Sequence, residues 1–134
     1  MTASFDFPAR SWLFAPGDSE KKIAKAADSA ADIVIFDLED AVAPSAKPAA
    51  RTLVADALHG RRDDRSRLWV RVNPLDGDWT LADLAAVMPA APGGIMLPKA
   101  RGRADVERLD HYLLAFEAAH DISPGATKIH ALVT

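Results

Sequence analysis

The sequence predicts an α/β fold built on a parallel sheet. Short apolar runs, too short for helices and without the alternation of half-exposed strands, recur along the chain and end in polar residues. Segments with the apolar spacing of helices lie between them. This order favours right-handed parallel crossovers, with four helices between five strands in one domain that spans residues 1–134.

The apolar runs are the expected strands, and each is bounded by residues that end regular structure. They cover residues 12–15, 33–36, 68–70, 95–97 and 129–133. Because none of them alternates, we expect the strands to be covered on both faces of the sheet.

The helices are expected over residues 20–27, 46–58, 81–88 and 104–120. Ser19 or Asp18 can cap the first helix, and Gly60 can stop the second. Thr80 can cap the third helix, which prolines close before a pair of glycines turns the chain into the next strand.

Carboxylates that close a buried strand indicate a functional site. The wholly apolar run 33–36 is followed by Asp37, Glu39 and Asp40. Burying a carboxylate is costly unless a cation or a hydrogen-bond donor meets it. Arg71 and Lys99 follow the third and fourth runs. We therefore expect these side chains to converge on one rim of a curved parallel sheet.

Composition excludes several classes of function. The chain has 134 residues, a net charge of −3 and no cysteine, which gives no case for nucleic acid as a partner and excludes disulfides and thiolate metal ligands. It has no signal-peptide core and no apolar run of membrane-spanning length, so we expect a cytoplasmic protein without a membrane partner. The arginines of segment 61–67 alternate with aspartates, which favours a solvated loop.

Several motifs together resemble one enzyme family. Residues 10–17 (RSWLFAPG), 37–42 (DLEDAV), 70–74 (VRVNP) and 97–99 (LPK), with Lys47 and residues 50–51, resemble the citrate lyase beta subunit family. This is the wider HpcH/HpaI aldolase superfamily, which includes malyl-CoA and citramalyl-CoA lyases. The resemblance implies a TIM (β/α)8 barrel of which this chain holds roughly the first half.

The resemblance also implies a reaction. The expected activity is Mg²⁺-dependent cleavage or formation of a 3-hydroxyacyl thioester, such as citryl-CoA or malyl-CoA, with an acyl-CoA and a 2-oxo acid as the fragments. Coenzyme A or an acyl carrier would bear the thioester, and we expect a homo-oligomer. The family holds magnesium with a glutamate and an aspartate that we expect only after Thr134, so the isolated chain should be inactive.

The resemblance gives the basic residues roles in binding. Arg71 would grip the substrate carboxylate, because a guanidinium group matches two carboxylate oxygens. Arg10 would be a second contact for the anionic substrate, and Lys99 would bind substrate or orient its loop. Arg71 could instead be a structural counter-ion for the acids.

The remaining expected site residues are two acidic and two positively charged side chains. Asp37 and Glu39 would orient the magnesium ligands or metal-bound water, or transfer protons. Lys47 and Arg51 would contact the phosphates of coenzyme A, or else form ion pairs with the acidic segment.

Two other functions remain open. A receiver-like signalling domain could bind magnesium through acids at a strand end, although here the acids follow the second strand and Arg71 ends the third. A non-catalytic half-barrel could serve as an interaction module and dimerise to close its sheet.

Overall fold

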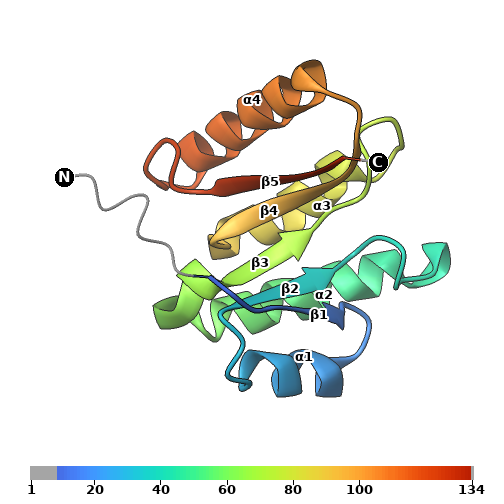
Figure 1. Cartoon of the computed structure of the whole chain (residues 1–134), viewed down its shortest axis with the longest axis vertical. Coiled ribbons are helices and arrows are strands. Elements are labelled where there is room, and N and C mark those ends of the chain that lie inside the picture. Colours follow the sequence, from blue (N-terminus) through green and yellow to red (C-terminus); the bar gives the residue numbers. More distant parts are fainter. Residues whose placement is uncertain (1–8, 134) are drawn as a thin grey trace.

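The computed structural model describes residues 9–133, and residues 1–8 and Thr134 lie outside this described part. Strands and helices alternate along it as predicted (Figure 1). The strands are β1 (Trp12–Pro16), β2 (Ile33–Asp37), β3 (Leu68–Arg71), β4 (Gly94–Ala100) and β5 (Lys128–Val133). The α-helices are α1 (Glu20–Ala27), α2 (Lys47–His59), α3 (Thr80–Val87) and α4 (Arg103–Ala119). Short 3-10 turns occupy Pro44–Ala46, Arg62–Arg67 and Met88–Ala90.

The strands form one parallel sheet in chain order, β1-β2-β3-β4-β5. Helices α2 and α3 lie behind this sheet in Figure 1, and its concave face is turned toward the viewer. Successive βα units in this order are the arrangement of a TIM barrel, and the described chain forms about half of one. The receiver-like alternative is wrong, because that fold places its first strand between the second and third.

The main core lies between the sheet and the helices. Val34, Phe36, Val54, Leu84 and Leu109 have no exposed surface there. Burial of each such side chain stabilises the fold by about 1.5–3 kcal/mol relative to exposure. β2 is buried along its whole length, as a central strand covered on both faces should be.

The concave face has a smaller cluster of Ile33, Ile35, Trp69 and Met96. Gly94 makes room for the Trp69 ring, because a Cβ atom at Gly94 would lie 2.5 Å from two of its carbons. The sequence alone gave no sign of this close approach.

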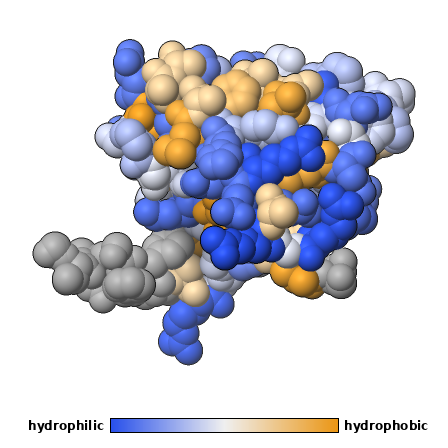
Figure 2. Space-filling model, turned by 90° about the horizontal axis from the view of Figure 1, so that it is seen from above, coloured by the Kyte–Doolittle hydropathy of each residue, from blue (hydrophilic) through white to orange (hydrophobic). Residues whose placement is uncertain are grey.

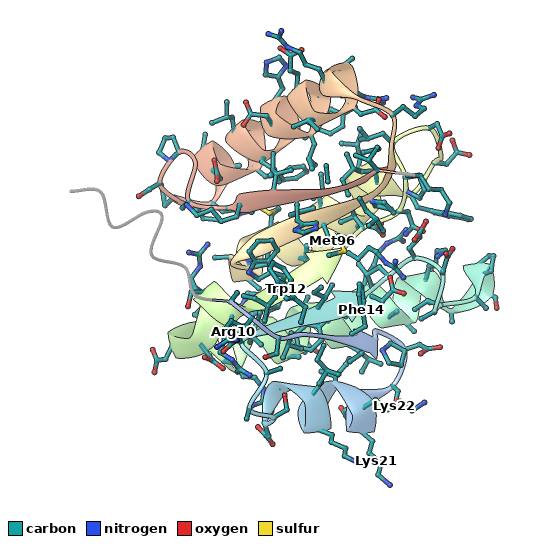
Figure 3. The ribbon with its side chains drawn as sticks, in the orientation of Figure 1. Arg10, Trp12, Phe14, Lys21, Lys22 and Met96 are labelled. Atoms are coloured by element: carbon teal, nitrogen blue, oxygen red, sulfur yellow. The ribbon has the colours of Figure 1, made fainter. Side chains whose placement is uncertain are left out.

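The prediction of full coverage is wrong for the two edge strands, β1 and β5, because most residues of each are exposed or half-buried. Trp12, Leu13 and Phe14 are 38%, 41% and 46% exposed, because β1 lies at an edge of the described sheet. Figure 3 shows Trp12, Phe14 and Met96 on the concave face. The Trp12 ring contacts Trp69 at a centroid distance of 5.3 Å and His130 of β5 at 5.2 Å. The sheet is therefore curved enough for side chains of its two edge strands to meet.

The predicted caps are confirmed for two of the helices. The hydroxyl of Ser19 accepts a hydrogen bond from the Lys22 amide, and α2 ends at Gly60. Thr80 is not a cap, because it lies inside the first turn of α3. Its hydroxyl instead donates to the carbonyls of Asn73 and Pro74, which anchors the segment that follows β3.

Segment 61–67 is not the solvated loop that its composition predicted. The Arg67 guanidinium donates to the carbonyls of Ala27, Ser29 and Ala31 at 3.0–3.2 Å. Arg65 donates to the carbonyls of Ala91 and Pro92. Both guanidinium groups thus donate to backbone oxygens of neighbouring loops, and these hydrogen bonds connect segment 61–67 to those loops.

One face of the molecule is mostly polar. Figure 2 looks onto the top of the molecule in Figure 1 and shows mostly hydrophilic residues with separate apolar patches. Among residues 9–133, no helix is long and apolar enough to cross a membrane.

Candidate functional site

The parallel register places Asp37 of β2 directly beside Arg71 of β3. The Nε and Nη2 atoms of Arg71 donate to the two Asp37 carboxylate oxygens at 2.8 and 2.7 Å. The side chains are only 16% and 2% exposed, so this paired geometry is shielded from water. The pair closes the carboxyl ends of two neighbouring strands, where TIM barrels build their active sites.

Asp37 also organises the chain that follows it. Its two oxygens accept hydrogen bonds from the amides of Glu39 (2.8 Å) and Ala41 (3.0 Å). Burial by itself would raise the pKa of Asp37. The hydrogen bonds from Arg71 and the two amides outweigh that effect and hold the pKa of Asp37 below its ordinary value of 3.8.

Glu39 is buried between two cations. Its Oε1 lies 3.6 Å from Arg71 Nε, and its Oε2 accepts a hydrogen bond from Lys99 Nζ. The same ammonium lies 3.6 Å from the exposed carboxylate of Asp40. The hydrogen bond to Glu39, together with the nearby negative charge, raises the pKa of Lys99. Asp37, Glu39, Arg71 and Lys99 therefore converge on one rim, as predicted.

Lys99 reaches this rim from an unusual backbone conformation. It has a φ of +52°, in the left-handed region that side chains other than glycine rarely adopt. The β4–β5 register breaks between Leu97 and Ala100, so the strand bulges at this point. The bulge lets the Lys99 side chain, 55% exposed, extend toward Glu39.

Residues 37–42 form a segment that we call the acidic loop. Lys47 stabilises this loop through hydrogen bonds to its backbone. Its ammonium donates to the carbonyls of Leu38 (2.8 Å), Glu39 (3.0 Å) and Val42 (3.1 Å). It is 4% exposed and lies 5.0 Å from the centre of the Trp79 ring. A lysine has three N–H donors, and each has an acceptor here. Lys47 also lines the pocket beside this loop, so a contact with coenzyme A stays a prediction.

Arg51 pairs with an acid that the sequence reading missed. Its Nε donates to Asp83 of α3 at 2.8 Å, so it contacts neither the acidic loop nor solvent to any large extent. Asp83 has no exposed surface and also accepts hydrogen bonds from the backbone and side-chain nitrogens of Asn73. The signal was available, because Asp83 falls on the stripe of α3 that faces the core, where an acid needs a partner.

Arg10 does not join the site. It precedes β1 at the amino end of the sheet, whereas Pro16 at the other end of β1 pairs with Asp37 (Figure 3). Its backbone amide donates to Asp32. The expected substrate contact is therefore not supported by the position of Arg10.

An open pocket of about 390 Å³ lies beside the acidic loop. Glu39, Asp40 and Lys99 line its polar side, and Pro74 and Trp79 contribute to its apolar side. A small anionic ligand with an apolar part would find both kinds of surface here.

The described residues do not form a metal site by themselves. Among residues 9–133, no group of three or more His, Asp or Glu side chains could hold a metal ion. The carboxylates of Asp37 and Glu39 are already matched by Arg71 and Lys99. Whether these acids lie beside a magnesium ion therefore stays a prediction.

Comparison with known proteins places this geometry in context. The sequence matches the HpcH/HpaI aldolase/citrate lyase family over residues 10–133. It is 38% identical over 124 residues to the citrate lyase subunit beta of Haemophilus influenzae, covering 92% of this chain and 43% of the relative. It is 43% identical over 100 residues to a (3S)-malyl-CoA thioesterase of Cereibacter sphaeroides, covering 75% of this chain and 35% of the relative.

A solved structure shares the fold. The citrate lyase beta subunit of Mycobacterium tuberculosis, complexed with oxaloacetate and magnesium, superimposes with a TM-score of 0.69 and 35% identity. The match covers 93% of this chain and 59% of that chain. This chain thus spans less than half the length of the two relatives above.

Proposed function

Because the chain belongs to the HpcH/HpaI aldolase/citrate lyase family, we propose that it is the N-terminal part of a carbon–carbon lyase. The substrate class is a 3-hydroxyacyl thioester, which the enzyme would cleave to an acyl thioester and a 2-oxo acid. The observation that carries this proposal is the convergence of Asp37, Glu39, Arg71 and Lys99 at the carboxyl ends of β2, β3 and β4.

Arg71 is the residue that we assign to the substrate carboxylate. Its Nε and Nη2 face Asp37, while its Nη1 has no hydrogen-bond partner among the described residues. Phe14 lies 4.8 Å from the guanidinium carbon and covers one of its faces. A guanidinium held on one edge by Asp37 presents its other edge in a fixed direction, which suits recognition of a carboxylate. Arg71 is in this way both counter-ion and substrate contact.

Cleavage leaves negative charge on both fragments, so the site must stabilise anions and move a proton. Glu39 is the residue we assign to proton transfer, because its carboxylate lines the pocket and is held by cations on two sides. Lys99 supplies positive charge at the exposed rim for an anionic group of the substrate. Asp37 orients Arg71 and the loop amides.

Magnesium belongs to the proposal for the whole enzyme. The M. tuberculosis relative was solved with this ion and oxaloacetate. A hard divalent cation would polarise the carbonyl of a 2-oxo acid. Residues 9–133 do not offer a complete ligand set, and the place of the direct ligands remains a proposal drawn from the family resemblance. A homo-oligomeric assembly also remains a prediction.

The proposal is tested with purified full-length protein and a panel of citryl, malyl, methylmalyl and citramalyl thioesters of coenzyme A. We expect release of a 2-oxo acid from at least one of them, abolished by EDTA and restored by Mg²⁺. Release of free coenzyme A thiol without any 2-oxo acid would indicate a thioesterase and overturn the lyase assignment. Absence of both products across the panel would overturn it as well.

The exposed apolar residues of β1 favour a second candidate, a non-catalytic half-barrel that binds a partner. Trp12 and Phe14 on the concave face would be covered by such a partner. The mass of the native protein discriminates between the two functions. A mass near that of the 134-residue chain would favour the module, and a mass about twice as large would favour the lyase.

A further inference from the structure

A buried polar chain connects α3 to the acidic loop. Asp83 accepts hydrogen bonds from the Asn73 backbone nitrogen at 2.8 Å and from Asn73 Nδ2 at 2.7 Å. Asn73 Nδ2 also donates to the carbonyl oxygen of Leu38 at 3.0 Å. Asp83 and Asn73 are 0% and 1% exposed, so water does not compete for these bonds.

The Leu38 carbonyl is the point where this chain acts. It belongs to the peptide unit between Leu38 and Glu39, whose amide hydrogen is directed at Asp37. Lys47 donates to the same carbonyl at 2.8 Å, and the Leu38 amide donates to the carbonyl of Arg71. The plane of this peptide determines the direction in which the Glu39 side chain leaves the backbone. Hydrogen bonds to its carbonyl and from its amide hold this plane in place.

The orientation of the Asn73 amide depends on Asp83. A side-chain amide nitrogen has two N–H groups, and in Asn73 one is directed at Asp83 and the other at Leu38. Asp83 is itself held by Arg51. Loss of the Asp83 charge would leave the Asn73 amide free to rotate away from the loop.

We propose that Asn73 and Asp83 are positioning residues, which hold the Leu38–Glu39 peptide so that Glu39 points into the pocket. This role rests on the proposed function for its catalytic consequence. The geometric part, the immobilisation of the acidic loop, does not depend on which reaction the site performs.

The test compares Asn73→Ala and Asp83→Asn with a matched control. Glu117→Gln is the control, because Glu117 is 1% exposed and accepts hydrogen bonds from the Gly125 and Thr127 amides before β5, at the other end of the sheet. It alters a buried carboxylate without touching the acidic loop. Asn73→Ser is the milder variant to use if Asn73→Ala does not fold.

Hydrogen exchange of the Glu39 and Ala41 amides is measured in the full-length protein. We expect exchange to be at least about tenfold faster in the Asn73 and Asp83 variants, and within about twofold of wild type in Glu117→Gln. Unchanged exchange in the Asn73 and Asp83 variants would overturn the proposal. Equal acceleration in the control would also overturn it, because the effect would then be loss of global stability.

Steady-state kinetics give the second readout. In Asn73→Ala we expect kcat to fall about tenfold or more while KM changes little, at a melting temperature close to that of Glu117→Gln, which should keep its kcat. An equal fall of kcat in both variants would contradict positioning. If the wild-type protein has no lyase activity, the proposed function fails, while hydrogen exchange still decides whether Asn73 and Asp83 hold the loop.

Discussion

Asp37 and Arg71 lie opposite each other on adjacent parallel strands, and the guanidinium binds both oxygens of the carboxylate. This contact gives Arg71 a structural role beside the role in substrate binding that we propose for it. Replacing Arg71 removes the counter-ion of Asp37, whose carboxylate is only 2% exposed. A loss of activity in an Arg71 variant therefore has to be separated from a loss of stability.

A double-mutant cycle measures the stability part of this effect. We expect Arg71→Ala to lower the free energy of unfolding by about 3–5 kcal/mol, because a buried charge loses its partner. Adding Asp37→Asn should restore part of the loss, with a coupling energy of about 1–3 kcal/mol. Urea unfolding of the two single variants and the double variant measures it. Strictly additive effects would show that the pair is not coupled.

The low pKa of Asp37 predicts a loss of stability in acid. Because the pKa in the folded protein lies below the ordinary value of 3.8, the contribution is complete above that value and disappears as the pH falls through the lower one. Urea unfolding from about pH 5 downward should show a shallower acid decline for Asp37→Asn than for wild type. Parallel declines would remove Asp37 as a source of the acid sensitivity.

The backbone conformation of Lys99 predicts that two substitutions at this position differ in stability while both lower activity. Its φ of +52° costs about 1 kcal/mol for a residue with a Cβ atom, and glycine avoids that cost. We expect Lys99→Gly to be more stable than Lys99→Ala by up to about 1 kcal/mol. Both variants lack the ammonium beside Glu39, so turnover should fall in both. Thermal unfolding and a turnover assay of the pair check this, and equal stability would argue against strain at this position.

Arg67 should matter for stability although its neighbours in sequence are charged and polar. Its guanidinium donates hydrogen bonds to the carbonyls of Ser29 and Ala31, and these bonds hold the turn before β2. We expect Arg67→Ala to cost about 2–3 kcal/mol and Arg67→Lys nearly as much, because a lysine cannot reproduce the fork. Arg62 on the same segment is the control, because it is exposed and donates to a single carbonyl, that of Pro89, at 3.2 Å. Its replacement by alanine should change stability by less than about 0.5 kcal/mol. Denaturant unfolding decides the matter, and equal losses for both would contradict the assigned role.

The strands, the helices and their order could be predicted from the sequence because apolar runs and helical spacing repeat in a simple rhythm. The convergence of Asp37, Glu39, Arg71 and Lys99 could also be predicted, since the carboxyl ends of parallel strands share one edge. Arg10 was misplaced for the same geometric reason, because it stands before its strand and therefore at the opposite edge.

What escaped prediction depends on side-chain direction. Composition suggests that Arg65 and Arg67 are solvated, yet both turn back to backbone carbonyls. Lys47 and Arg51 look available for phosphates, yet one is enclosed by loop carbonyls and the other by Asp83. Such contacts join residues far apart in sequence, and no local pattern specifies them.

The contact between Trp12 and His130 joins the two edge strands of the described sheet across its concave face. The two outermost strands of this sheet already lean toward each other, so the bend does not depend on a closed ring. Aromatic rings pack on the inner surface at this bend, and Gly94 leaves the recess for one of them. The concave shape is therefore present within the described strands themselves.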